Sequence, residues 1–506
     1  MTKRHISAQD KPLRGRGRPV LTISAVLVIA ALIVATFGAC WENKASLTKS
    51  RIRKVEKGLL RAVYLKGQTP EKLALEARMP FYKVPAVSIA VMDGNGLEWS
   101  KAYGVRGSRL PEPVTTETLF QAGAAGQPMA AAAALGLVER GKLSLESDVN
   151  ASLKSWKVPA DEGAEKAPVT LRSLLSYAAG FPVTPLAGYP GSGKVPTLKD
   201  VLEGRGSGFG AVAPEPGPGW PGRPSEAGYA VLEQLLEDVS GTPFPSLAKE
   251  TVIAPLGLVR STFEEPLPDA AMAAASSGHG RDGRPIEGGA LVYPATAADG
   301  LWTTPVELLL FAADVLASAR GQGGKVLSSE MARAMLTPQS GNAGFGVFID
   351  GVGTDIRIHV RGRTSGFTTV LEVYPYKGQG AVIMANSDNG FLLSDEILRA
   401  LSAAYEWPDF KPEEKAVYRI DPSITRGYAG RYEVTPEYSL DVAAEDYYLV
   451  IRPTGQAPTR FYVESETFFF SVDPYIRIQF LSDEKGRVTG LVLWQEDFKQ
   501  EAKKVG

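Results

Sequence analysis

The alternation of apolar and polar residues changes character several times along the chain, and each change predicts a different element. Residues 20–41 form an uncharged, mostly apolar run, which is long enough to cross a bilayer as a helix. Residues 42–78 are charged and helix-prone, and they predict a juxtamembrane helix or linker. Between residues 84 and 105, two β-rich runs flank an Asp-Gly-Asn-Gly turn, which is a hairpin signal.

The pattern then turns helical and later returns to strands. An alanine-rich stretch from Ala122 to Val138, followed by Gly141, predicts a helix. Four strand-like runs occupy residues 344–389, and a second helix is expected from Ser394 to Tyr405. Strands at both ends with helices between them predict an α/β (α+β) fold, in which one sheet is assembled from distant segments and carries a helical insertion.

The last part of the chain has a third pattern. Six short runs within residues 416–506 alternate strongly between apolar and polar positions and are separated by turns. This pattern is typical of a small all-β barrel or sandwich. About 90 residues are enough for such a block to form its own domain.

The amino-acid composition argues against several classes of function. The chain has 55 Lys plus Arg and 56 Asp plus Glu, so no net field favours a nucleic acid as partner. Its single cysteine excludes an intramolecular disulfide and a cysteine-rich zinc site. Three scattered histidines, without a His-Glu-x-x-His motif, give no reason to expect a metal. We expect no cofactor.

The N-terminal residues predict attachment to a membrane. A basic segment, residues 1–19, precedes the apolar run of residues 20–41, as in a transmembrane anchor or a secretory signal. Cys40 ends the run after small residues, similar to the lipidation site of bacterial lipoproteins, although Phe37 stands where leucine is usual. The nearest flanking charges place the N-terminus inside. We therefore expect the cell membrane, with a single-pass or lipid anchor and the globular part outside the cytoplasm.

Residues 79–407 resemble the class C β-lactamase-like serine hydrolases, which include esterases, D-amino-acid peptidases and penicillin-binding proteins. The resemblance implies an antiparallel sheet flanked by helices, and residues 416–506 resemble the small β-domain that often follows. The phrases that carry it, in the family's order, are VPAVSIAVMDGNGLEWSKAYGV, TLFQAGAAGQPMAAAAALGLVERGKLSLESDVN, LRSLLSYAAGF, GYAVLEQLLEDVSGTPF, PLGLVRSTF, GLWTTPVELLLFA and GQGAVIMANSDNG.

The family's catalytic residues are absent where the resemblance places them. The family uses a serine at the start of a helix and a lysine three positions later, one helical turn apart. This sequence has Ala124 and Gln127 there. Alanine has no nucleophilic atom, and a carboxamide is not a base at neutral pH.

Two further motifs of the family are also changed. Pro224 stands where the resemblance places the proton-transferring tyrosine, and Glu226 adds a carboxylate to that loop. The strand that faces the nucleophile reads Val360, Arg361 and Gly362. His359 is one residue out of register, which turns its side chain to the other face.

Three altered motifs predict a pseudoenzyme that binds a ligand or partner at the cell envelope. Its ligand would be a peptidoglycan fragment, a peptide or a protein. The residues expected to line the ligand site are Ala124, Gln127, Glu226, Arg361 and Gly362.

Two alternatives remain open at this point. In an active serine hydrolase of esterase, β-lactamase or D-amino-acid peptidase type, Glu226 would activate a rewired nucleophile, for which the candidates are Ser176, Ser225, Ser277 and Ser365. Residues 188–194, GYPGSGK, fit the GxxxxGK skeleton of a phosphate-binding loop but lack the following Ser or Thr. We interpret His279 as a turn or surface residue, and Tyr177, Asp299 and Trp302 as structural residues.

Overall fold

The computed structural model describes residues 44–107, 110–159, 168–183, 185–205, 210–215, 222–495 and 498–505. The chain divides into two compact units, residues 1–52 and residues 53–506. The expected membrane segment, residues 20–41, and Cys40 lie outside the described residues. No helix in the described ranges is both long and apolar enough to cross a membrane.

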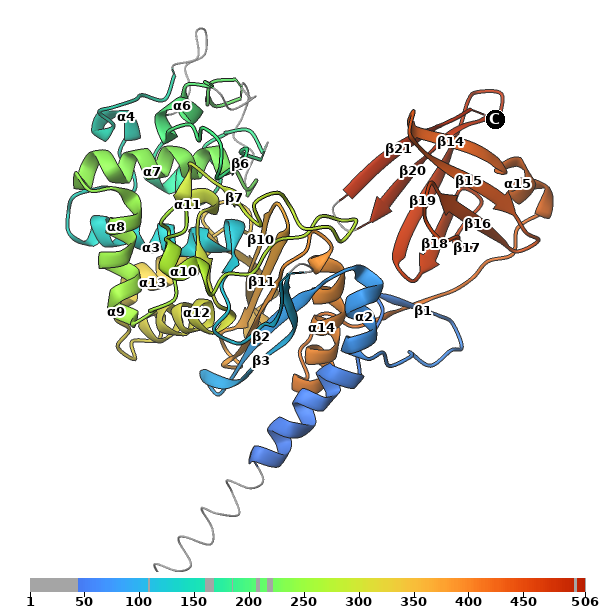
Figure 1. Ribbon diagram of the computed structural model, residues 1–506, viewed down its shortest axis with the longest axis horizontal. Coiled ribbons are helices and arrows are strands. Elements are labelled where there is room, and N and C mark those ends of the chain that lie inside the picture. The colour runs from blue at the N-terminus through green and yellow to red at the C-terminus, as the bar shows by residue number, and fades with distance from the viewer. Residues whose placement is uncertain are drawn as a thin grey trace, which may run out of the picture. The chain divides into compact units, whose positions relative to one another are not determined.

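A seven-stranded antiparallel sheet forms the centre of the second unit, in the order β4-β3-β2-β12-β11-β10-β9 (Figure 1). Its strands are β2 (Ala86–Asp93), β3 (Gly96–Gly107), β4 (Leu110–Pro113), β9 (Phe348–Asp350), β10 (Arg357–Thr364), β11 (Phe367–Tyr374) and β12 (Gln379–Ala385). The pair β2–β12, with Ala90 opposite Val382, joins the two ends of this part of the chain. The expectation of one sheet built from distant segments is confirmed.

Helices cover both faces of this sheet. Helix α14 (Gly390–Tyr405) packs on β11 and β12, and α2 (Leu75–Tyr82) packs on α14. Helix α12 (Pro305–Ala319) packs on β2, β3 and β12. Strands β11 and β12 are therefore buried on both sides. The remaining helices are η1 (Gly123–Gly126), α3 (Gln127–Glu139), α4 (Val149–Ser152), α5 (Leu171–Leu175), α6 (Leu198–Leu202), α7 (Glu226–Ser240), α8 (Phe244–Ala248), η2 (Lys249–Ile253), α9 (Ala254–Leu256), α10 (Asp269–Met272), α11 (Thr296–Asp299), α13 (Ser329–Met335) and η3 (Gly353–Asp355).

Helix α3 shows why the alanine-rich sequence folds as it does. Its residues from Gln127 to Leu137 are all buried, so the helix has no face for polar side chains. Small side chains let the neighbouring elements approach the helix closely, and alanine costs least in a helix interior.

The C-terminal part is a closed barrel of eight antiparallel strands. These are β14 (Gly430–Thr435), β15 (Tyr438–Ala444), β16 (Tyr448–Pro453), β17 (Thr459–Val463), β18 (Phe468–Val472), β19 (Tyr475–Ser482), β20 (Val488–Gln495) and β21 (Phe498–Lys504), preceded by α15 (Pro422–Gly427). Alternate residues point inward and fill the interior, Leu449, Phe469 and Leu491 among them. Strand β21 closes the barrel on β14.

Two parts of the sequence prediction need correction. The charged segment 42–78 is not one helix. It is helical over residues 44–57, then forms the short strand β1 (Val63–Leu65), and becomes helical again where α2 begins at Leu75; Gly58 and Gly67 interrupt the helical run. The barrel has two strands beyond the six expected, β15 and β21. Strand β21 was missed because only Ala502 of its described side chains is buried, so its alternation of apolar and polar residues is weak.

Short strands complete the described part of the fold. They are β5 (Phe120–Gln121), β6 (Tyr189–Pro190), β7 (Leu291–Val292), β8 (Trp302–Thr303) and β13 (Glu413–Lys415).

Candidate functional site

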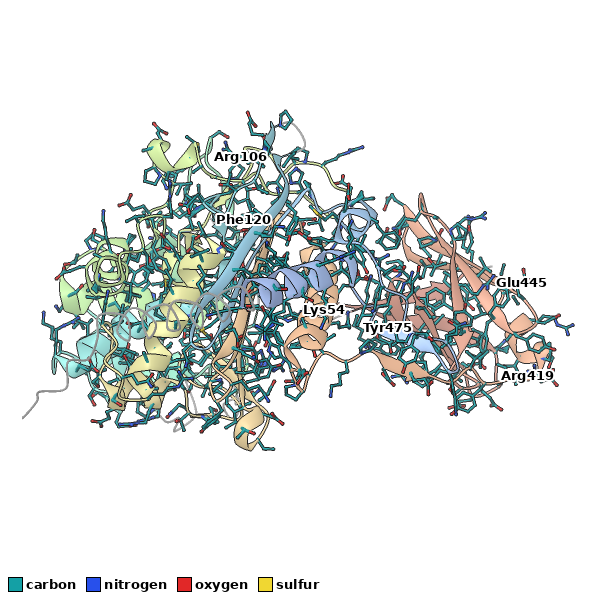
Figure 2. The ribbon with its side chains drawn as sticks, turned by 90° about the horizontal axis from the view of Figure 1, so that it is seen from below. Lys54, Arg106, Phe120, Arg419, Glu445 and Tyr475 are labelled. Atoms are coloured by element: carbon teal, nitrogen blue, oxygen red, sulfur yellow. The ribbon has the colours of Figure 1, made fainter. Side chains whose placement is uncertain are left out.

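The positions of the missing catalytic pair lie at the junction of β5, η1 and α3, directly against β10. Phe120, labelled in Figure 2, is fully buried and leads into η1. Ala124 lies in η1 and is partly exposed, and Gln127 begins α3 and is 1% exposed. The position expected for a nucleophile thus carries only a methyl group.

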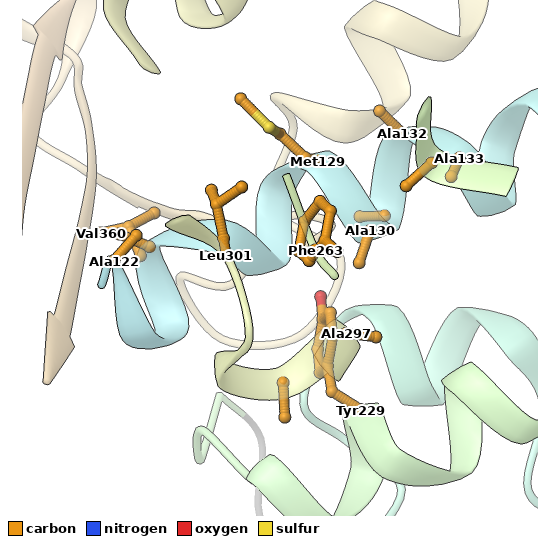
Figure 3. Packing of buried hydrophobic residues seen from close by; sticks show 14 of the residues in the cluster. Ala122, Met129, Ala130, Ala132, Ala133, Tyr229, Phe263, Ala297, Leu301 and Val360 are labelled. Atoms are coloured by element: carbon orange, nitrogen blue, oxygen red, sulfur yellow. The ribbon is translucent and has the colours of Figure 1, made fainter. Parts of the chain in front are cut away.

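Glycines allow β10 to lie against η1. A Cβ on Gly362 would come within 2.0 Å of the Ala122 carbonyl oxygen, and one on Gly123 would come within 2.7 Å of the Arg363 nitrogen. Gly123 also has a φ of 55°, which favours glycine. Val360 on β10 packs with Ala122, Leu301 and Met129 around the start of α3 (Figure 3).

Gln127 is held in a chain of neutral hydrogen bonds. The Tyr177 hydroxyl donates to Gln127 Oε1 over 2.7 Å, and Gln127 Nε2 donates to the Ala298 carbonyl over 3.3 Å. The Tyr229 hydroxyl in turn lies within hydrogen-bonding reach of the Tyr177 hydroxyl. Both ends of the carboxamide are satisfied inside the protein, so a polar network without an ammonium group occupies this place.

The two tyrosines of this network cannot serve as bases. Tyr177 stacks on Phe348 at 5.3 Å and lies 5.5 Å from the ring of Tyr229. Burial raises the pKa of Tyr177 and of Tyr229 far above the value of a free phenol. Both hydroxyls therefore remain protonated at neutral pH.

The loop that replaces the family's tyrosine motif has a structural role at Ser225. Ser225 caps the N-terminus of α7, since its Oγ accepts from the Gly228 nitrogen at 3.2 Å and donates to the Pro182 carbonyl at 2.7 Å. Pro224 is exposed. The Ser225 hydroxyl has no base beside it in these contacts, so it acts as a helix cap.

The half-buried Glu226 and the buried Asp299 form a carboxyl pair that the sequence did not predict. Glu226, the first residue of α7, accepts a hydrogen bond from the Leu186 nitrogen and lies against Asp299 at the end of α11. Asp299 is 2% exposed. Burial raises the pKa of both carboxyls, and the neighbouring Glu226 raises that of Asp299 further. Two carboxyls in contact share a proton because both cannot ionise cheaply.

Ser365 and Tyr293 lie next to this pair. The Ser365 nitrogen donates to the Tyr293 hydroxyl over 3.0 Å, and the two side chains are also in hydrogen-bonding contact. Burial and the nearby carboxyls of Asp299 and Glu226 raise the pKa of Tyr293 to about 12. A phenol with so high a pKa does not withdraw the proton of the exposed Ser365 hydroxyl.

Strand β10 directs its side chains alternately to two sides. Val360 faces the core beside Ala122, whereas Arg361 pairs with Asp395 of α14 and lies 5.2 Å from the ring of Phe391. His359 Nε2 lies 2.9 Å from Asp350, and burial lowers the pKa of this imidazole to about 4. His359 is therefore neutral at pH 7, and the structure does not bring Arg361 together with Ala124 and Gln127.

The other residues considered from the sequence are placed as follows. His279 is 0% exposed, and its Nδ1 lies 2.9 Å from the Asn386 carbonyl oxygen. His279 was expected in a turn or at the surface, and a surface position is wrong. Ser176 donates to the Arg172 carbonyl within its own helical turn. In the GYPGSGK segment, Tyr189–Pro190 pairs with β7. A phosphate-binding loop would lead straight into a helix, whereas α6 begins only at Leu198.

One hollow near this region is very small. This hollow of about 10 Å³ is lined by Tyr177, Phe181 and Ser225 among others, hardly enough for one water molecule. Within the described ranges no group of three or more His, Cys, Asp or Glu is placed to hold a metal ion. The predicted ligand-binding role of Ala124, Gln127, Glu226, Arg361 and Gly362 stays a prediction.

The altered pair Ala124 and Gln127 is visible in the sequence, whereas the residues around it are not. Tyr177 and Asp299 were interpreted as structural, and Tyr229 and Tyr293 carried no motif. The one signal was Glu226, an acid in an unusual place, and no spacing rule connects it to Asp299.

Comparison with known proteins gives the following relations. The family model described as Beta-lactamase matches residues 73–404. Penicillin-binding protein 4* of Bacillus subtilis (strain 168) is 22% identical over 82% of this chain and 94% of its own. A putative D-alanyl-D-alanine carboxypeptidase of Escherichia coli (strain K12) is 26% identical over 43% of this chain and 52% of its own. The octameric penicillin-binding protein homologue from Pyrococcus abyssi has a similar fold, with a TM-score of 0.57 and 21% identity over 84% of this chain and 99% of that one.

Proposed function

This chain belongs to the beta-lactamase family, and we propose that it is an inactive member that binds a ligand or partner without hydrolysing it. The observation that carries the proposal is the pair Ala124 and Gln127, with the Gln127 carboxamide engaged by Tyr177 and Ala298. Losing the key members of a nucleophilic unit costs roughly a millionfold in turnover. No acyl-enzyme can form at a methyl group.

The electrostatics of the region support binding of a ligand without a carboxylate. The Glu226–Asp299 pair retains one negative charge when it shares a single proton. One relative is named as a putative D-alanyl-D-alanine carboxypeptidase, and the substrate that this name implies ends in a carboxylate. A peptide whose C-terminus is amidated would avoid repulsion from this pair.

Covalent labelling tests the inactive site. Purified full-length protein is incubated with a fluorescent penicillin and, separately, with a fluorophosphonate probe, and intact mass is measured. We expect no stoichiometric adduct. Incorporation of one probe per chain would contradict the proposal, and peptide mapping would then identify the nucleophile.

The alternative of a rewired serine hydrolase rests on Ser365 beside Tyr293. The raised pKa of Tyr293 argues against it, because the phenol is a poor base at neutral pH. If an adduct forms on wild type and is lost in Ser365→Ala but kept in Ser225→Ala, this alternative replaces the inactive site.

Ligand binding is tested separately by isothermal titration with D-alanyl-D-alanine peptides that are amidated or free at the C-terminus. The proposal expects the amidated peptide to bind more tightly. Glu226→Gln, which removes the charge, should reduce the difference between the two peptides. Binding of neither peptide would restrict the proposal to a protein partner, to be sought by crosslinking from position 226.

We also propose that the protein is anchored in the cell membrane with its globular part outside the cytoplasm. The support is the apolar run 20–41 after the basic segment 1–19. Mass spectrometry of the membrane-extracted N-terminus would distinguish a lipidated Cys40 from an intact spanning segment. Recovery of the protein in the wash of salt-treated membranes would contradict both.

A further inference from the structure

A second cavity lies away from the altered catalytic pair. It has a volume of about 340 Å³, within the lower range of small-molecule sites. Its walls come from the segment before β1, α2, α14 and the barrel strands β18, β19 and β20 within the single unit of residues 53–506. The lining residues are Arg61, Ala62, Tyr82, Leu392, Asp395, Glu396, Arg399, Val472, Tyr475, Arg477 and Trp494.

The acidic residues of this cavity are engaged by other cations. Asp395 pairs with Arg361. Glu396 accepts from Arg78 at 2.7 Å and 2.8 Å and from the Tyr82 hydroxyl at 2.8 Å. Both carboxylate oxygens of Glu396 and Oδ1 of Asp395 are thus occupied by these partners.

Two of the three lining arginines are also engaged. Arg61 donates to Asp473 at 2.8 Å and to Glu71 at 2.7 Å. Arg477 pairs with Glu464 at 2.6 Å and lies 4.4 Å from the ring of Phe468. Each of these guanidinium groups has a carboxylate in direct contact.

Arg399 differs from the other arginines. It is partly buried on α14, and Asp395 and Glu396 act on it only through space. Burial lowers its pKa from the usual value, as happens when a cation loses water without gaining a hydrogen-bonded anion. An arginine presents a planar set of donors that fits a carboxylate or phosphate.

Aromatic side chains line the remaining walls. Trp494, Tyr82 and Tyr475, the last labelled in Figure 2, contribute ring surfaces. Trp494 also stacks with Phe468 at 6.3 Å, which fixes its ring. Such walls favour a flat or ring-shaped body beside the charged group.

We propose that this cavity binds a small organic anion, a carboxylate or phosphate carried on a ring, through Arg399 with Trp494 and Tyr475 as walls. The site is independent of the altered catalytic pair and of whether that pair is inactive. The anion would supply the contact that Asp395 and Glu396 do not give to Arg399.

The test uses the full-length protein in detergent, titrated calorimetrically with benzoate, phenyl phosphate and benzamide. One site per chain should bind benzoate or phenyl phosphate with a Kd on the order of a millimolar. The neutral benzamide should not bind measurably. A preference for benzoate or for phenyl phosphate tells a carboxylate ligand from a phosphate ligand.

Single substitutions test whether the anion binds in this cavity. Arg399→Gln should weaken anion binding ~10-fold or more, and Trp494→Ala should weaken it as well. Arg487→Gln, at an exposed arginine of the barrel that pairs with Asp483, is the matched control and should leave binding unchanged. Equal binding by Arg399→Gln and wild type, or no saturable binding of either anion, would overturn the proposal.

A melting experiment without ligand separates this role from a purely structural one. If Arg399 holds α14 through Asp395 and Glu396, Arg399→Gln will lower the melting temperature. The proposal expects an unchanged or higher melting temperature, because the variant removes a desolvated cation without a contact partner. A clear decrease together with unaltered anion binding would contradict it.

Discussion

The Tyr177 hydroxyl donates a 2.7 Å hydrogen bond to Gln127 Oε1 in the interior of the protein. Removing the hydroxyl in Tyr177→Phe should reduce the free energy of unfolding by about 1 kcal/mol, because Gln127 loses a buried donor. Urea denaturation measures the change. Tyr376→Phe, at a residue that is 68% exposed, serves as control; equal effects of the two substitutions would show that the bond adds no stability.

Gly362 lies where β10 meets η1, and a methyl group there would overlap the Ala122 carbonyl oxygen. Gly362→Ala should therefore destabilise the protein by about 3 kcal/mol or more. The matched substitution is Gly96→Ala, because a Cβ at Gly96 meets nothing within 4 Å; it should stay within about 0.5 kcal/mol of wild type. If thermal unfolding shows both variants as stable as wild type, β10 does not pack on η1 as described.

Glu265 should make stability depend on pH. Burial raises the pKa of Glu265 from 4.5 to about 8, although Trp302 and Gln121 donate to its Oε1. With a folded pKa above the unfolded one, its contribution is complete below about pH 4.5 and is lost as the pH rises through about 8. Between these two pH values the unfolded protein has lost the Glu265 proton and the folded protein still holds it. Its contribution to the free energy of unfolding should therefore fall by roughly 1.4 kcal/mol per pH unit.

Glu265→Gln isolates that contribution. A glutamine keeps one oxygen to accept from both donors but binds no proton in this range, so the decline between pH 5 and 8 should become shallower. Urea titrations at several pH values measure the slope. The exposed residue Glu437 provides the control Glu437→Gln, and a slope in Glu265→Gln identical to that of wild type would refute the assignment.

Arg78 joins the sheet-and-helix part to the barrel through Glu396 and Asp473, with contacts of 2.6 to 2.9 Å. Arg78 is 5% and Glu396 2% exposed. Arg78→Met should cost about 3–5 kcal/mol, because it leaves the buried Glu396 carboxylate without its hydrogen-bonded cation, whereas Asp473 keeps Arg61. The exposed pair Arg487–Asp483 is the comparison, where Arg487→Met should cost at most about 1 kcal/mol. Calorimetry would detect the loss, and similar values for both variants would contradict it.

More of the fold than of the candidate site could be predicted from the sequence. Hairpin β2–β3, helix α3 and the late strands follow from local alternation and from the Asp-Gly-Asn-Gly turn, since such patterns depend on near neighbours. Strand β21 was not predicted, because only Ala502 of its described side chains is buried and the alternation of apolar and polar residues is weak.

The altered residues Ala124 and Gln127 could be read from the sequence, but their contacts could not. Tyr177 and Gln127 are 50 residues apart, and Glu226 and Asp299 come from different helices. These pairings depend on how α3, α7 and α11 pack together, and no sequence spacing encodes that packing.

Strand β2 lies between β3 and β12, so its two neighbours are made at different times during synthesis of the chain. On the ribosome, the hairpin of residues 86–107 emerges long before residues 379–385, so one side of β2 keeps open backbone donors and acceptors meanwhile. Such an open edge invites pairing with another nascent chain. A chain released before Ala385 is made should therefore aggregate more readily than the full-length chain.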